Sequence, residues 1–260
     1  MKIAGKNVLL TGASGGLGEA IAKELAGRGA RLTLTARRVG ELTQLAEAVG
    51  GEVLVADLAE QGDLDRVIEA GNDVDILIAN AGMGQDSPIS ELTSAEIDLA
   101  IAVNLRAPIL MATEFVQAHL DSGKPGHIVF IGSLSGIVTS PDTRMYNATK
   151  FGLRGFALSL RQDLLGSNMG VSLVAPGFIR DAGMFAESGM KLPSGVRTKT
   201  PDDVARGVAK AIESNAAELF VAPLELRLGA TLGSVAPTLS ARIQGLAGAA
   251  DIKSGRVVHE

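Results

Sequence analysis

The chain has 260 residues, 46% of them hydrophobic and 20% charged, a composition that excludes a disordered chain and a coiled coil and supplies ample apolar surface for one core. Its net charge of -5 gives no global attraction to nucleic acid or to anionic lipid. It contains no cysteine, which excludes disulfides and thiolate metal sites, and we expect no metal.

The first apolar run leads straight into glycines rather than into a cleavage site, so it predicts a strand and not an export signal. A long stretch free of Asp, Glu, Lys and Arg, residues 164–179, is interrupted by Gly, Asn, Ser and Pro. It falls short of the ~18 to 20 apolar residues that a spanning helix needs. We therefore expect a cytoplasmic protein with no membrane span.

Short β-branched or leucine-rich runs alternate with segments of helical periodicity along the whole chain. The runs cover residues 8–11, 32–35, 53–56, 76–79, 128–131, 171–174 and 219–221. Continuous apolar strands that alternate with helices indicate a parallel sheet covered on both faces. The pattern predicts an α/β protein with a doubly wound Rossmann fold and a mostly parallel seven-stranded sheet. We expect one domain at residues 1–222 and an apolar helical extension at residues 223–260 packed on it.

The first predicted strand runs into a glycine-rich loop, in which Gly12, Gly16 and Gly18 accompany Ser14 and Leu17. Glycine permits a tight turn and lets a pyrophosphate approach the backbone N–H groups at the positive end of a helix. The spacing is G-x-x-x-G-x-G rather than the common dinucleotide fingerprint, and no Lys-Ser or Lys-Thr pair follows as in a Walker loop. The loop's position predicts a dinucleotide site, although a turn that merely joins strand to helix has the same composition.

The end of the second predicted strand carries Ala36, Arg37 and Arg38 where an NAD site has an acidic residue. A guanidinium binds a 2′-phosphate through charge-assisted hydrogen bonds, whereas a carboxylate repels it. The sequence therefore favours NADP(H) as the cofactor, with NAD(H) as the alternative. The other interpretation is that both arginines are only solvated surface. A methyltransferase uses a similar sheet but requires an acid at the position of Ala36 and Arg37, so these residues argue against this alternative function.

Tyr146, the one tyrosine of the chain, precedes Lys150 by four residues, so on a helix both side chains lie on one face. A free phenol has a pKa of about 10 and is a poor acid-base catalyst near neutrality. A nearby ammonium, reinforced by an oxidised nicotinamide ring, favours the phenolate and moves this pKa toward the working pH. Taken alone, the pair is equally typical of a helix surface.

Several further residues occur in an order that, with the glycines and the Tyr146–Lys150 pair, resembles the short-chain dehydrogenase/reductase family. The resemblance covers roughly residues 6–221. It rests on Gly12, Gly16, Gly18, Asp57-Leu58, Asn80-Ala81-Gly82, Asn104, Ser133, Tyr146, Lys150 and Pro176-Gly177.

The resemblance implies an NADP(H)-dependent oxidoreductase that interconverts a ketone or aldehyde and an alcohol by hydride transfer. It implies that Tyr146 donates the proton, that Ser133 binds the carbonyl oxygen and that Lys150 lowers the tyrosine pKa and holds the nicotinamide ribose. Asn104 is implied to hold a water of the proton relay, and Asp57 to contact the adenine. The family often has a threonine after the turn that corresponds to Pro176-Gly177, but here Phe178-Ile179 follows, so we expect the Ile179 backbone to bind the carboxamide.

Each of these assignments has an alternative that involves no function. Asp57 can be a helix N-cap, Asn80-Ala81-Gly82 an ordinary turn, and Asn104 a buried residue satisfied by the backbone. Ser135 shares a face with Ser133 if the strand continues, and it is the second candidate for the carbonyl-binding hydroxyl. For the whole protein, the alternative function is a non-catalytic NADP(H)-binding sensor or scaffold.

The loops expected around a substrate are largely apolar, which suits an apolar carbonyl better than a sugar, although the same residues can be core. They contain Met83, Leu134, Ile137, Val138, Met145, Phe178, Met184, Phe185 and Met190. Residues 182–193 have the composition of a closing lid.

Near the C-terminus, apolar residues recur at helical spacing, with an expected kink at Pro237. They are Leu224, Leu228, Leu232, Val235 and Leu239. This stripe is interpreted as cover for the pocket, a subunit contact or, least favoured, a membrane contact. The family resemblance implies a homodimer or homotetramer formed through the helices that carry Asn104 and Tyr146.

Overall fold

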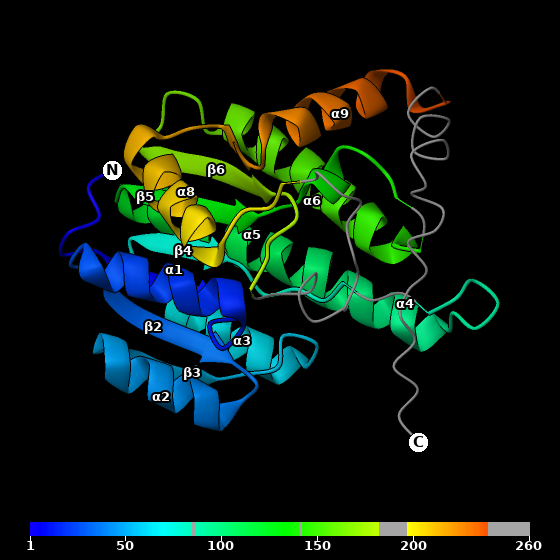
Figure 1. The fold of residues 1–260 in the computed structure, drawn as a ribbon. Helices are drawn as coiled ribbons and strands as arrows, with labels where there is room; N and C mark the ends of the chain where they lie inside the picture. The colour runs from blue at the N-terminus through cyan, green and yellow to red at the C-terminus, as the bar shows by residue number, and fades with distance from the viewer. Residues whose placement is uncertain (85–86, 141, 182–196, 239–260) are drawn as a thin grey trace.

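The computed structural model describes residues 1–84, 87–140, 142–181 and 197–238. Its centre is one parallel sheet with the strand order β3-β2-β1-β4-β5-β6-β7 (Figure 1). All seven predicted strands are present, and their ends differ from the predicted ones by at most two residues. The strands are β1 (Asn7–Thr11), β2 (Arg31–Ala36), β3 (Glu52–Val55), β4 (Ile76–Ala79), β5 (Gly126–Ile131), β6 (Met169–Pro176) and β7 (Glu218–Val221).

Helices cover both faces of this sheet, so the predicted doubly wound architecture is confirmed (Figure 1). One face packs against α1 (Gly16–Gly27), α2 (Val39–Val49) and α8 (Pro201–Ser214). The other face packs against α3 (Gln61–Gly71), α5 (Ala107–Ser122) and α6 (Arg144–Asp163). Successive residues of a strand point to opposite faces. Accordingly, Leu10 belongs to the first apolar core and Leu9 to the second, both fully buried.

A long apolar helical run lies between β4 and β5. It begins as α4 (Ser94–Ile101), passes through a π-helical turn at Ala102–Arg106 and continues as α5. The run Ser94–Ser122 is long and apolar enough to cross a membrane, but Met111 and Phe115 are buried against the sheet. This packing identifies a core helix. Its π-helical turn, a feature that recurs at functional sites, contains the buried Asn104.

The last helix described, α9 (Leu224–Val235), follows β7 and presents its apolar stripe to the outside. Leu224, Leu228, Leu232 and Val235 are exposed, whereas Ala230 and Gly233 are buried. Helix α9 ends at Val235, Ala236 leaves the helical conformation, and Pro237 and Thr238 are helical again. The interruption therefore falls one residue before the expected kink at Pro237, since a proline disfavours the helical conformation of the residue that precedes it. Leu239 lies outside the described residues.

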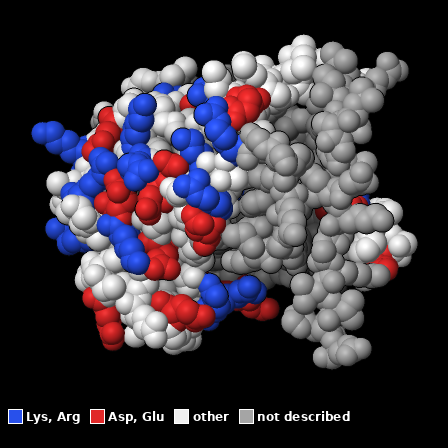
Figure 2. Space-filling model, viewed as in Figure 1, with Lys and Arg blue, Asp and Glu red and all other residues white. Residues whose placement is uncertain are grey.

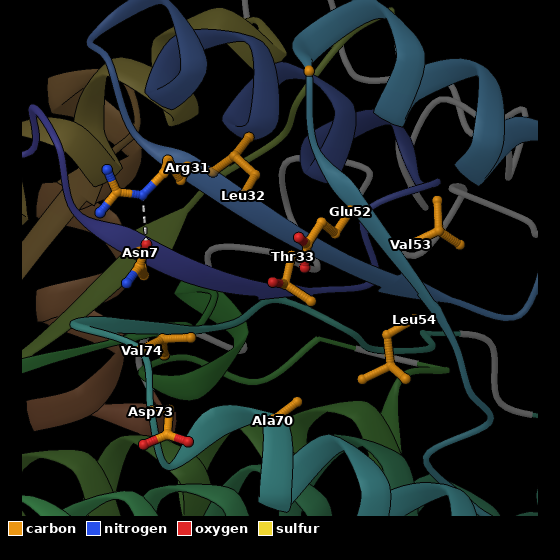
Figure 3. A pocket seen from close by; sticks show the side chains of 11 residues that line it. Asn7, Arg31, Leu32, Thr33, Glu52, Val53, Leu54, Ala70, Asp73 and Val74 are labelled. Carbon is orange, nitrogen blue, oxygen red and sulfur yellow. Dashed lines mark hydrogen bonds between the residues drawn. The ribbon is translucent and has the colours of Figure 1, made fainter.

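A groove of about 630 Å³ lies beside the β3 edge of the sheet (Figure 3). Asn7 and Arg31, the first residues of β1 and β2, line it, and the Arg31 guanidinium donates to the Asn7 side chain at 2.8 Å. Ligands of parallel α/β sheets bind at the carboxyl ends of the strands. This groove opens toward the amino ends and is therefore not the candidate cofactor site.

The surface over α1, α2 and α8 carries basic and acidic side chains interspersed with one another (Figure 2). Several form ion pairs, such as Arg28 with Glu213 at 3.0 Å and Arg206 with Asp203 at 2.8 Å. Exposed pairs of this kind contribute little stability. Among its described residues, this face therefore has no patch of a single sign that would attract a polyanion.

Candidate active site

The structure brings the candidate residues together at the carboxyl edge of the sheet. Gly12 follows β1, Asn80 follows β4, Ser133 follows β5 and Gly177 follows β6. These strands are neighbours in the order β1-β4-β5-β6, so residues far apart in the sequence meet at one edge. This edge is where the fold places ligands.

The glycine loop between β1 and α1 has no room for side chains at two positions. Gly12 adopts a φ of 65°, and a Cβ there would lie 2.7 Å from Ala81 Cα. A Cβ on Gly18 would lie 2.2 Å from the Gly12 carbonyl oxygen. Helix α1 begins at Gly16, and its N-cap Gly15 provides no side-chain cap. The first-turn N–H groups, including those of Leu17 and Gly18, have no intrahelical partner and can bind a pyrophosphate.

Because of this close contact, Gly18→Ala is expected to weaken nicotinamide cofactor binding at least about tenfold and to lower the unfolding temperature, since the loop must move to admit the methyl group. Gly27→Ala is the matched control, because a Cβ at the last residue of the same helix meets no atom within 4 Å. The two variants are compared by cofactor titration and thermal unfolding. Equal behaviour of both variants would show that the loop tolerates a side chain.

Hydrogen bonds join the Asn80-Ala81-Gly82 segment, at the end of β4, to the glycine loop. Asn80 Nδ2 donates to the carbonyl oxygens of Thr11 at 2.9 Å and Gly12 at 3.1 Å. In return, Thr11 Oγ1 accepts from the backbone N–H groups of Asn80 and Ala81, both at 3.0 Å. The segment is therefore more than an ordinary turn, because it fixes the shape of the loop. The sequence alone does not single out Thr11, since a threonine at the end of a strand carries no distinctive signal.

The two arginines after β2 contact different segments of the same sheet edge. Arg38 donates from Nε to Ser14 Oγ at 3.3 Å and from a terminal nitrogen to the Ser14 carbonyl oxygen. Arg37 lies 3.6 Å from a carboxylate oxygen of Asp57, which follows the end of β3. Two basic side chains thus lie near the end of β2, where a dinucleotide bound to this loop would place its ribose.

The Asp57-Leu58 pair forms a turn between β3 and α3. Asp57 Oδ1 accepts from the Ala59 N–H at 3.0 Å, and the Asp57 N–H donates to Asp63 at 2.8 Å, whereas Leu58 is buried. The alternative that Asp57 caps α3 is wrong, since the N-cap residue is Glu60. One carboxylate oxygen of Asp57 is thus fixed by the turn, and the other faces Arg37.

The Tyr146–Lys150 pair is on the first turns of α6, as its spacing predicts. Lys150 is buried, with its Nζ 5.7 Å from the centre of the Tyr146 ring, and it donates to the Ile131 carbonyl oxygen at 2.8 Å. A hydrogen bond joins the side chains of Ser133 and Tyr146. Gly136 provides the space for this packing, because a Cβ there would lie 2.7 Å from the Lys150 carbonyl oxygen. The structure therefore excludes the helix-surface interpretation of this pair.

Ser135 does not share the position of Ser133. Strand β5 ends at Ile131, and residues Leu134–Gly136 form a 3-10 turn capped by Ser133, with the Ser135 N–H donating to Ser133 Oγ at 3.0 Å. The condition for the alternative, a continued strand, is not met. Ser133 is the hydroxyl that contacts Tyr146.

Asn104 is buried in the π-helical turn and joins two parts of the site. Its side chain accepts from the Met83 N–H at 2.8 Å and donates to the Met83 carbonyl oxygen at 2.7 Å, and it lies 3.3 Å from Thr149 Oγ1 on α6. The Asn104 side-chain amide is thus hydrogen-bonded to the backbone of Met83, as the alternative interpretation expects. Asn104 also links the loop after β4 to α6, the helix that carries Tyr146.

Burial sets the pKa values of the pair in this structure. It raises the pKa of Tyr146 above its ordinary value, and the hydrogen bond with Ser133 opposes this rise. It lowers the pKa of Lys150 from 10.5 to about 8. The expected fall of the tyrosine pKa is therefore not a property of the protein alone, since desolvation disfavours the phenolate and the ammonium alike.

The lowered lysine pKa predicts a dependence of stability on pH. Between pH 8 and 10.5 the unfolded chain keeps the Lys150 proton that the native protein has lost, so the free energy of unfolding rises with pH in this window. We expect a rise on the order of 3 kcal/mol over the full window, which Lys150→Met removes. Denaturant unfolding at several pH values tests this, with the exposed Lys210→Met as the control. An unchanged slope in Lys150→Met would contradict the assigned burial.

The turn after β6 carries backbone groups that can face a ligand. The Gly177 N–H donates to the Val221 carbonyl oxygen at 3.1 Å, which fixes the turn after Pro176. Ile179 is buried and bridges Lys199 in a parallel register, but the hydrogen bonds of this bridge come from its neighbours, the Arg180 N–H and the Phe178 carbonyl. The N–H and carbonyl of Ile179 therefore point away from the bridge.

The predicted substrate-lining residues are only partly described. Met83, Leu134, Val138, Met145 and Phe178 are half-buried, and Ile137 is buried. Met184, Phe185, Met190 and the predicted lid at residues 182–193 lie outside the described residues.

A parallel sheet in this strand order, with a glycine loop at the start of α1 and a Tyr–Ser–Lys cluster at the same edge, defines a dinucleotide-binding oxidoreductase. The chain matches the family model described as short chain dehydrogenase over residues 6–192. It belongs to the short-chain dehydrogenase/reductase family.

Relatives of known structure or name agree with this membership. The chain is 31% identical to Ketoacyl reductase HetN of Nostoc sp. over 268 residues, 98% of this chain and 93% of that protein. It resembles a short-chain dehydrogenase from Sphingobium yanoikuyae in complex with NADPH, with a TM-score of 0.77, 28% identity and coverage of 97% and 98% of the two chains. It also resembles the bulky-bulky ketone specific alcohol dehydrogenase from Comamonas testosteroni, with a TM-score of 0.75, 26% identity and coverage of 98% and 96%. The chain is an oxidoreductase that acts on CH–OH donors with a nicotinamide cofactor.

Proposed function

We propose that the protein is an NADP(H)-dependent oxidoreductase that interconverts a largely apolar ketone or aldehyde and the corresponding alcohol. The observation that carries this proposal is the contact between Tyr146 and Ser133 beside the buried Lys150, at the strand edge that also holds the glycine loop. This arrangement places a proton donor, a second hydroxyl and an ammonium next to one another.

In the proposed mechanism, Tyr146 donates a proton to the carbonyl oxygen during reduction and removes it during oxidation. Ser133 donates a hydrogen bond to the same oxygen as negative charge develops on it. Lys150, fixed by the Ile131 carbonyl, stabilises the phenolate and binds the nicotinamide ribose. The nicotinamide cofactor, when bound, supplies or accepts the hydride and, when oxidised, adds the positive charge that favours the phenolate. Asn104 holds the β4 loop in place and anchors a water that connects the site to solvent.

The residues of the strand edge fit such a cofactor, because the glycine loop packs closely at two positions that admit no side chain and leads into the N-terminus of α1, whose first-turn N–H groups can bind a pyrophosphate. We assign the pyrophosphate to the α1 N-terminus, and the ring carboxamide to the backbone groups of Ile179. The residues at the ends of β2 and β3 would hold the adenine and its ribose. The full set proposed to bind the cofactor is Gly12, Ser14, Gly16, Leu17, Gly18, Arg37, Arg38, Asp57, Leu58, Asn80, Ala81, Gly82, Tyr146, Lys150, Pro176, Gly177 and Ile179.

The preference for NADP(H) over NAD(H) rests on Arg37 and Arg38. Arg38 contacts Ser14 of the glycine loop, Arg37 lies near Asp57 at the end of β3, and no carboxylate occupies the position of Ala36. The structural relative in complex with NADPH supports the same choice.

A largely apolar substrate is favoured by the half-buried Met83, Leu134 and Phe178 in the loops around the site. Two relatives are named for ketone or ketoacyl substrates, which supports a carbonyl attached to a carbon chain. A panel of 3-oxoacyl thioesters, bulky ketones and sugars, followed by NADPH consumption, tests this choice. Reduction of sugars in preference to the apolar ketones would contradict it, and NADPH binding without any turnover would instead support the sensor or scaffold.

Two further proposals concern the assembly. A homodimer or homotetramer through the helices of Asn104 and Tyr146 is supported by exposed apolar residues on those helices, namely Leu99, Ile101 and Phe151. We also propose that residues 1–222 form the catalytic domain, on which the extension from residue 223 packs, and that the protein acts in the cytoplasm.

A further inference from the structure

Each arginine at the end of β2 faces a carboxylate. Arg37 lies 3.6 Å from Asp57, and Arg38 lies 3.4 Å from Glu41, three residues further along on the first turn of α2. Two positive and two negative charges thus meet where the proposed cofactor carries its 2′-phosphate. A phosphate monoester has a charge of about -1.5 to -2 at neutral pH, so it is attracted by the arginines and repelled by the carboxylates.

The two arginines are engaged to different extents. Arg38 uses all three of its guanidinium nitrogens: Nε and one terminal nitrogen donate to Ser14, and the other terminal nitrogen, Nη1, faces Glu41. Arg37 has one ion pair in the part of the chain that the structure describes, longer than a hydrogen bond, and its side chain is 70% exposed. Arg37 can therefore turn to a phosphate without losing a hydrogen bond, whereas at Arg38 Nη1 a phosphate meets the negative charge of Glu41.

The two carboxylates also differ. Asp57 is tied into the turn before α3 through its hydrogen bond with Ala59, and it remains necessary for the shape of that turn. Glu41 is 53% exposed, and its ion pair with Arg38 is the contact that the structure gives it among the described residues. Glu41 is in the first turn of α2, where its negative charge interacts favourably with the helix dipole. Glu41 is thus the carboxylate whose removal changes the charge of the site and leaves its framework intact.

We infer that Glu41 is a specificity-determining residue for the cofactor: it competes with the 2′-phosphate for Arg38 and thereby lowers the ratio of NADP(H) to NAD(H) affinity. The inference rests on the cofactor site of the proposed function. The ribose of NAD(H) carries a hydroxyl in place of the phosphate, so its binding does not depend on displacing this carboxylate.

Glu41→Gln tests the inference, because the amide keeps the size of the side chain and removes its charge. Exposed ion pairs are weak, so we expect NADPH to bind about two- to five-fold more tightly and NADH to bind with unchanged affinity. Glu47→Gln is the matched control, since it removes the same charge from the exposed side of α2 away from the arginines. Dissociation constants of NADPH and NADH are measured for the wild type and both variants by titration of cofactor fluorescence.

A second pair of variants shows whether Glu41 acts through Arg38. In the Arg38→Ala background, Glu41→Gln should no longer change the ratio of the two affinities by more than the control does, because the contested guanidinium is absent. Equal tightening of NADPH by Glu41→Gln and Glu47→Gln, or equal tightening of NADPH and NADH by Glu41→Gln, would overturn the inference. If the wild type prefers NADH, the proposed NADP(H) preference fails, but the change in ratio still decides the role of Glu41. If the wild type binds neither cofactor, both fail.

Discussion

Tyr146→Phe is expected to lower turnover by about 10²- to 10⁴-fold, the contribution of a positioned proton donor. The phenylalanine ring retains the packing of α6 against the site, and the change removes only the hydroxyl that Ser133 contacts. Because Tyr146 is the one tyrosine of the chain, no other phenol can replace it. Steady-state rates with NADPH and an accepted ketone measure the loss.

NADPH binding by the Tyr146→Phe variant is the control that separates a loss of proton donation from damage to the site. Lys150 and the glycine loop are unaltered, so NADPH should bind to Tyr146→Phe within a few-fold of the wild type, and the unfolding temperature should change little. Near-normal turnover in the variant would exclude Tyr146 as the proton donor. Loss of NADPH binding together with turnover would instead show that the substitution disturbs the site.

Arg37→Ala is expected to weaken NADPH binding by about 1.5 to 3 kcal/mol, the range for hydrogen bonds to charged groups. NADH binding should hardly change, because the guanidinium is proposed to contact only the 2′-phosphate. Arg206→Ala is the control, because it also removes an exposed arginine that pairs with an aspartate, but one that lies on α8. Titrations with both cofactors measure the effect.

Adding Ala36→Asp to Arg37→Ala should reverse the preference, because a carboxylate accepts from the ribose hydroxyls and repels a phosphate. A partial loss in the single variant is consistent with a shared contact, and Arg38→Ala in combination would then remove the remainder. A wild type that binds NADH more tightly than NADPH would mean that the arginines are only surface charge at this site.

The sheet and the Tyr146–Lys150 pair follow from the sequence because both depend on local periodicity. A buried parallel strand needs a continuous apolar run, as in Ile76–Ala79, and one helix turn brings residues four apart onto one face. The family order of the motifs then indicates which strand ends meet. These predictions need no knowledge of side-chain partners.

The remaining features depend on contacts between distant segments, which periodicity does not reveal. The hydrogen bonds of Asn80 to the glycine loop bridge 68 and 69 positions of sequence. The rise in the Tyr146 pKa comes from burial, and a sequence that shows only the nearby lysine predicts the opposite direction. The sequence does not single out Glu41, because an acid three residues after Arg38 is typical of any solvated helix start.

Transfer of deuterium from reduced NADP labelled at the hydride position of the nicotinamide to a ketone tests the central proposal most directly. The wild type is incubated with the labelled cofactor and a bulky apolar ketone, and the alcohol is analysed by mass spectrometry and NMR. We predict stoichiometric deuterium on the carbinol carbon, at a rate that falls by about 10²- to 10⁴-fold in Tyr146→Phe. Absence of the labelled alcohol across the whole carbonyl panel, with NADPH bound, would contradict the assignment as a carbonyl reductase.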